Sequence, residues 1–170
     1  MIDTQYTRIM TRYNRWMNGN IYDACAQLSD AARKRDVGAF FKSIHGTLNH
    51  LLLTDLVWLH RFRMEPYQFG SLADELHGDF DQLRAARERA DAQIDAEVMA
   101  MSDERLRERL SYRTASPPHA QRTMPVGVIV VHMFNHQAHH RGQVSTLLKQ
   151  MGVDPGVTDL PWMPGLESLL

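Results

Sequence analysis

The chain of 170 residues has the length of one domain, and its 44% hydrophobic and 23% charged residues are typical of a globular protein. Nineteen basic against twenty acidic residues give a formal net charge of −1, which argues against a dedicated nucleic-acid-binding protein. A single cysteine, Cys25, excludes an internal disulfide framework and any multi-cysteine zinc site. No apolar run reaches the roughly 18 residues of a membrane span, and the start of the chain lacks the order of a signal peptide. We therefore expect a cytoplasmic protein with no membrane segment.

Apolar residues recur at spacings of three and four in four long segments, which predicts four amphipathic helices. The expected ranges are about residues 3–28, 37–62, 71–100 and 125–151. Ser71 is expected to cap the third of these helices. Together the four helices predict a single all-α domain over residues 1–170, with the architecture of a four-helix bundle.

A long connection separates the third and fourth predicted helices. Ser102 is expected to start a short helical turn through Leu106, and the stretch around Ser116-Pro117-Pro118 is expected to form a small hairpin or an ordered loop. Residues 152–170 contain three prolines and three glycines, which predicts an irregular tail.

Nine histidines are present, and four of them lie between residues 132 and 140. His136 and His140 are one helical turn apart, so their Cβ atoms should lie about 5–6 Å from each other on one helix face. A pair at this spacing can direct two nitrogens at one metal ion. The alternative is a chance pair on a half-exposed, histidine-rich helix, and the spacing alone leaves both possibilities open.

A tight metal site needs a third ligand, and His50 in the second predicted helix is a candidate. Periodicity is compatible with an inward position for His50, although a hydrogen-bonded core or surface histidine is the alternative. Three histidines would leave a coordination position open for water or substrate, which is the layout of a catalytic site. Gln143, His139 and His132 lie near the pair and are candidates for supporting the ligands through hydrogen bonds. Gln143 could equally be a polar residue that closes the end of the bundle.

Three stretches of the sequence resemble the DinB family, also called the damage-inducible DinB/YfiT-like superfamily. They are RYNRWMNGNIYDA, DVGAFFKSIHGTLNHLLLTDLVWLHRF and HMFNHQAHHRGQVSTLL, and the last contains a His-x-x-x-His-Arg-Gly-Gln run. The resemblance implies a four-helix bundle of the up-down-down-up type, commonly a homodimer, that binds one divalent metal ion such as zinc or nickel. The ligands that it implies are His50, His136 and His140. The family's name also implies a damage-inducible protein with a role in the stress response.

The wider relatives of this family include thiol-dependent enzymes, namely mycothiol-dependent isomerases and bacillithiol S-transferases. A metal held by three neutral imidazoles keeps its 2+ charge and lowers the pKa of a bound water or thiol. The expected function is therefore a metal-dependent enzyme that transfers a low-molecular-weight thiol to an electrophile in S-transfer or detoxification, with hydrolysis by a metal-bound hydroxide as the variant. The alternative is a non-catalytic, stress-associated metal-binding bundle that acts through contacts with a second copy of itself or with another protein.

Two other functions are disfavoured by the sequence. Arginines in LRAARERADAQ and DERLRERL are interleaved with acidic residues, as on a solvated helix face, so no nucleic-acid partner is expected. A di-iron bundle needs Glu-x-x-His pairs, and the chain contains none. Cys25 lies among small residues with no basic neighbour to activate it, and we expect it to pack in the core.

Overall fold

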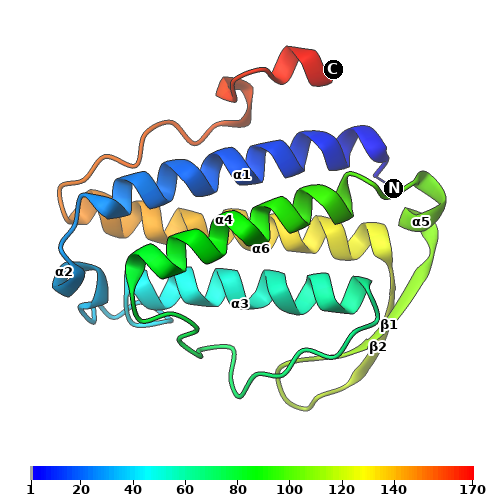
Figure 1. The fold of residues 1–170 in the computed structure, drawn as a ribbon, viewed down its shortest axis with the longest axis horizontal. Coiled ribbons are helices and arrows are strands. Elements are labelled where there is room, and N and C mark those ends of the chain that lie inside the picture. Colours follow the sequence, from blue (N-terminus) through cyan, green and yellow to red (C-terminus); the bar gives the residue numbers. More distant parts are fainter. Residues whose placement is uncertain (1) are drawn as a thin grey trace.

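The computed structural model describes residues 2–170, and Met1, the first residue of the predicted domain, lies outside this range. The chain is mostly helical, with one small two-stranded sheet (Figure 1). Its elements in chain order are α1 (Thr4–Ala26), α2 (Asp30–Lys34), α3 (Ile44–Phe62), α4 (Phe80–Val98), α5 (Asp103–Arg107), β1 (Arg109–Arg113), β2 (Gln121–Pro125) and α6 (Val126–Gln150). Two short 3-10 turns follow, at Leu160–Trp162 and Leu166–Leu169.

The four long helices pack against one another around two clusters of buried apolar side chains. Helix α1 contacts α4 and α6, and α3 contacts the same two helices. Figure 1 shows α1 and α6 running in one direction and α3 and α4 running in the opposite direction. One cluster includes Leu48 and Leu83, and the other includes Leu59 and Phe134. Among residues 2–170, no helix combines the length and the apolarity that crossing a membrane requires.

The first and last long helices begin and end close to the predicted residues. Asp3 caps α1, because its carboxylate accepts a hydrogen bond of 2.9 Å from the backbone N–H of Tyr6. Helix α6 follows Pro125 and ends two residues before Gly152, whose φ of 79° lies in the left-handed region that favours glycine. The strong apolar periodicity of both segments therefore predicted their structure correctly.

The connection between α4 and α6 also has the predicted form. Ser102 caps the short helix α5 by accepting a hydrogen bond of 3.2 Å from the Arg105 N–H. Strands β1 and β2 then pair antiparallel, with Arg109 opposite Pro125 and Arg113 opposite Gln121. This hairpin makes the chain mostly helical rather than all-α.

Helix α3 begins at Ile44, so the predicted start at residue 37 is wrong. Ser43 caps the helix, because its hydroxyl accepts a hydrogen bond of 3.0 Å from the Gly46 N–H. Residues 37–42 instead form a turn that is closed by a backbone hydrogen bond of 2.8 Å between its two ends. Phe41 lies at helical spacing from Ile44 and Leu48, so apolar periodicity continued past the true end of the helix.

Helix α4 begins at Phe80, so the predicted cap at Ser71 is also wrong. Asp79 is the residue that caps α4, through a hydrogen bond of 2.9 Å from the Gln82 N–H. The segment before it is an irregular loop that Asn49 of α3 holds in place. The Asn49 side chain accepts a hydrogen bond from the His77 N–H at 3.0 Å and donates one to the His77 carbonyl at 3.2 Å.

Candidate metal centre

Three histidines from two helices direct their Nε2 atoms toward one another. His50 comes from α3, and His136 and His140 come from successive turns of α6. The Nε2 atom of His136 lies 3.1 Å from Nε2 of His50 and 3.1 Å from Nε2 of His140. One nitrogen from each of the three residues lies within 4.8 Å of the other two. The packing of α3 against α6 thus brings together the three histidines that were identified in the sequence.

The other ring nitrogens of two of these histidines face oxygen acceptors. Nδ1 of His50 lies 2.7 Å from the backbone carbonyl oxygen of Leu72, and Nδ1 of His140 lies 2.7 Å from Oε1 of Gln143. Because both oxygens can only accept, each Nδ1 carries the proton and donates it. The Nε2 atom of each ring therefore presents a lone pair to the shared centre, as in a histidine metal ligand.

This arrangement of lone pairs fits a bound cation. Nε2 of His136 can carry at most one proton, and it faces the lone pairs of both His50 and His140. Without a cation, one proton would have to serve two acceptors, or lone pairs would oppose each other at 3.1 Å. Three imidazole nitrogens are a donor set that suits zinc, nickel or copper.

The protein environment keeps the three histidines neutral. Burial, which outweighs the opposing hydrogen bond to the Leu72 carbonyl and is aided by the nearby His140, lowers the pKa of His50 to about 4. Burial, followed by the neighbouring His140 and His50, lowers the pKa of His136 to about 3. Burial also lowers the pKa of His140. At neutral pH the rings are uncharged, which is the form that binds metal.

The metal-free protein is expected to lose stability as the pH falls from about 6.5 toward about 4. The pKa values of His50 and His136 are lower in the folded protein than in the unfolded chain. In this pH range the unfolded chain therefore binds more protons, and a fall in pH favours unfolding. Urea unfolding at several pH values measures the effect. We expect a slope of up to roughly 1.4 kcal/mol per pH unit for each buried histidine. The slope should be shallower in His50→Leu, and an identical slope in wild type and variant would contradict the assignment.

An aromatic ring from the turn before α3 covers the histidines. Phe41 stacks on His50, with ring centroids 3.8 Å apart and planes at 19°, and it meets the His140 ring edge to face at 5.5 Å. The turn can approach α3 this closely because residue 46 is glycine. A Cβ atom at Gly46 would lie 2.3 Å from the Phe41 carbonyl oxygen. Phe41 was not predicted as part of this site, because its helical spacing indicated a position in the helix itself.

The three predicted supporting residues differ in their contacts. Gln143 bonds directly to His140, as described above, and its Nε2 lies 3.2 Å from Nε2 of His139. His139 therefore contacts the ligand group through Gln143. His132 is exposed, and among residues 2–170 it forms no hydrogen bond to the three histidines, although its ring lies 5.8 Å from that of His136. The Leu72 carbonyl, which no side-chain pattern reveals, holds His50 instead.

Replacing Gln143 with leucine is expected to weaken metal binding by about 10–100-fold. The variant removes the acceptor for Nδ1–H of His140, so the ring loses its fixed orientation and part of its basicity. Competition with a chromophoric chelator measures the affinity. Gln150→Leu, an exposed position on the same helix, is the control that should bind like wild type. Equal affinity in Gln143→Leu would exclude this supporting role.

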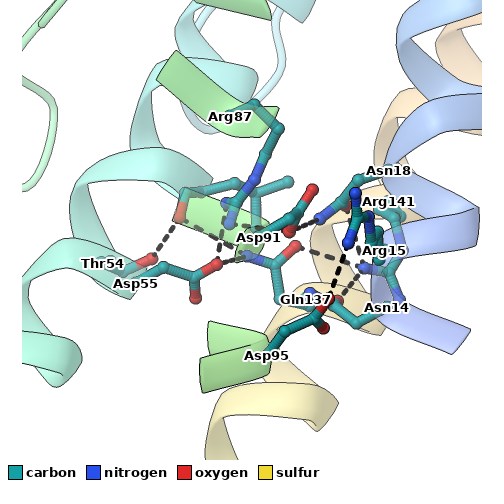
Figure 2. Close-up of polar contacts among 11 residues, drawn as sticks. Asn14, Arg15, Asn18, Thr54, Asp55, Arg87, Asp91, Asp95, Gln137 and Arg141 are labelled. Atoms are coloured by element: carbon teal, nitrogen blue, oxygen red, sulfur yellow. Dashed lines mark hydrogen bonds and ion pairs between the residues drawn. The ribbon is translucent and has the colours of Figure 1, made fainter. Parts of the chain in front are cut away.

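A buried polar network lies next to the histidines and joins all four long helices (Figure 2). Arg87 of α4 forms ion pairs with Asp55 of α3 at 2.8 Å and with Asp91 at 2.9 Å. Nε2 of Gln137 on α6 donates to Asp55 at 2.5 Å, and Asn18 of α1 donates to Asp91 at 2.9 Å. Burial disfavours the Arg87 cation, but the Asp91 and Asp55 carboxylates more than offset this, so the pKa of Arg87 is raised.

Arg141 completes this network from α6. It is buried, and its guanidinium donates to the side-chain oxygens of Asn14, of Asn18 at 3.1 Å and of Gln137 at 3.3 Å. Burial lowers the pKa of Arg141 to about 10, so it stays cationic at neutral pH. Amide oxygens thus hold Arg141 inside the protein.

Cys25 lies in the apolar core, as expected. Its side chain is fully buried, and burial raises the pKa of its thiol to about 12. A thiol in this state is a poor nucleophile.

Comparison with known proteins assigns the chain to a family and finds a similar fold among solved structures. The chain belongs to the DinB family, whose model matches residues 1–167. It is 25% identical over 155 residues to the protein DinB of Bacillus subtilis (strain 168), a match that covers 86% of this chain and 87% of that one. Among solved structures, a DinB-like protein from Bacillus cereus ATCC 10987 has a similar fold, with a TM-score of 0.62 at 20% identity, covering 85% of this chain and 91% of that one.

Proposed function

We propose that this protein is a metal-dependent enzyme that holds one divalent ion, zinc or nickel, through His50, His136 and His140. The observation that carries the proposal is the convergence of three neutral Nε2 atoms, two of them on rings fixed by hydrogen bonds from Nδ1. Membership of the DinB family supports it. The contacts of α1 and α3 with α4 and α6 support the finer proposal of an up-down-down-up four-helix bundle.

The reaction that we propose is transfer of a low-molecular-weight thiol to an electrophile. A divalent ion at this centre supplies positive charge that lowers the pKa of a thiol or water bound to it. His50, His136 and His140 bring no negative charge that would neutralise this effect. Phe41 keeps water from one face of the His50 ring. As the sulfur bonds to the electrophilic carbon, the leaving group departs from that carbon and the thiol proton passes to solvent.

The test is a turnover assay with zinc-loaded or nickel-loaded protein, a low-molecular-weight thiol and monochlorobimane. We expect conjugate formation that is lost in His140→Ala and kept in His119→Ala, a surface histidine outside the group. Failure with several thiols and several electrophiles, while metal binding persists, would favour the non-catalytic metal-binding protein. The homodimer, the damage-inducible expression and the cytoplasmic location stay predictions.

A further inference from the structure

A cavity of about 370 Å³ lies beside the three histidines. His50 and His136 form part of its wall, and most of the remainder comes from α3 and the β1–β2 hairpin. Its surface is largely apolar and aromatic, with contributions from Val57, Trp58 and Tyr112. The volume falls in the range of roughly 300–1,000 Å³ that is usual for small-molecule sites.

Among the described residues that line this wall, Arg61 is the one with a permanently charged side chain. It follows His50 by eleven residues on α3, which is roughly 16 Å along the helix and close to three whole turns, so both residues lie on the same face. The guanidinium carbon lies 4.5 Å from the centre of the Trp58 ring and 4.9 Å from that of Tyr112. Nη2 of Arg61 donates to the Arg113 carbonyl at 2.7 Å. These contacts hold the guanidinium beside the cavity.

The positive charge of Arg61 is not balanced by the protein. Among residues 2–170, no carboxylate forms an ion pair with Arg61, and none of the residues that line the cavity is acidic. Burial lowers the pKa of Arg61, which shows that the charged form is partly desolvated. The neighbouring His132 cannot balance this charge, because an imidazole ring is either neutral or positively charged. A half-buried cation with donors left over is a receptor for an anion.

We propose that this cavity binds a small organic carboxylate, with the carboxylate on Arg61 and the apolar body against Val57, Trp58 and Tyr112. The end of the bound molecule opposite its carboxylate would lie against His50 and His136, which also line the cavity. Its role as a substrate therefore rests on the proposed function. It assigns one substrate of the proposed thiol transfer to the class of carboxylic acids. The contact with Arg61 itself needs no metal, so the two proposals can fail separately.

Two probes of matched shape test the proposal, 3-phenylpropionate and the neutral 3-phenylpropionamide. Titration calorimetry of zinc-loaded protein should show the carboxylate binding at least about ten-fold more tightly than the amide. Arg61→Met should abolish this preference while keeping the apolar stem of the side chain. Arg89→Met, which removes an exposed arginine from α4, should keep it. Arg61→Lys retains the charge and should retain part of the preference, whereas a purely structural role for Arg61 predicts equal loss in both Arg61 variants.

No preference in the wild type, or a preference that survives in Arg61→Met, would overturn the proposal. The same titration on metal-free protein should still show a preference that depends on Arg61. Zinc uptake without any preference for the carboxylate would be consistent with the proposed metal-dependent function and would contradict the anion site at Arg61. A preference for the carboxylate that depends on Arg61, in a protein that takes up no metal, would support the anion site and contradict the proposed metal-dependent function.

Discussion

Untagged protein is expected to carry about one equivalent of zinc or nickel per chain, and the His136→Ala/His140→Ala double variant is expected to carry none. The reason is that a single remaining imidazole, His50, cannot replace the three nitrogens that meet at one point. Elemental analysis of both proteins, as purified and after incubation with each metal followed by desalting, measures the stoichiometry.

His119→Ala and His132→Ala serve as the controls for this experiment, because neither residue belongs to the group of three nitrogens. Both should keep the full equivalent of metal. A wild-type protein that takes up no zinc and no nickel at micromolar concentration would remove the basis of the proposed function. The three histidines would then be polar packing between α3 and α6.

Replacing Arg87 with methionine is expected to reduce the free energy of unfolding by about 3–5 kcal/mol. The substitution preserves most of the side-chain volume but leaves the buried carboxylates of Asp55 and Asp91 without their cation. Urea unfolding followed by circular dichroism measures the change. This loss should exceed that of most single substitutions, because an unpaired buried charge is among the most costly defects in a folded protein.

The matched control is Arg89→Met, two residues further along α4 and exposed, which should change stability by no more than about 0.5 kcal/mol. Adding Asp55→Asn and Asp91→Asn to Arg87→Met should recover part of the loss, since the stranded charges are removed. A triple variant less stable than Arg87→Met would show that the carboxylates act independently of the arginine.

Local patterns in the sequence predicted the elements that depend on local interactions. The pairing of His136 with His140 needs only the geometry of one helix, and apolar periodicity defined that helix within a residue or two. The cap at Ser102 and the hairpin around Pro117 follow from turn chemistry that is equally local. His50 was linked to the pair through a resemblance to a known family, because the packing of α3 on α6 is not a local property.

Contacts between distant segments could not be predicted in this way. Nothing in the residue types indicates that the Leu72 carbonyl would meet His50, since every residue has a carbonyl group. The starts of α3 and α4 were misplaced because aromatic and leucine residues continue at helical spacing into turns that tertiary contacts shape. The contacts of Arg141 are of the same kind, because its partners Asn14 and Asn18 lie on α1, more than 120 residues earlier.

The buried polar network also determines which pair of histidines on α6 faces His50. His132 and His136 repeat the spacing of His136 and His140, so sliding α6 by one turn, roughly 5.4 Å, would present a second pair to His50. On such a slide Gln137 would lose its present partner Asp55, and Arg141 would lose its present partner Asn18, which disfavours the shifted alignment. These two side chains fix the position of α6 along its axis, so that His132 lines the neighbouring cavity and His136 and His140 face His50.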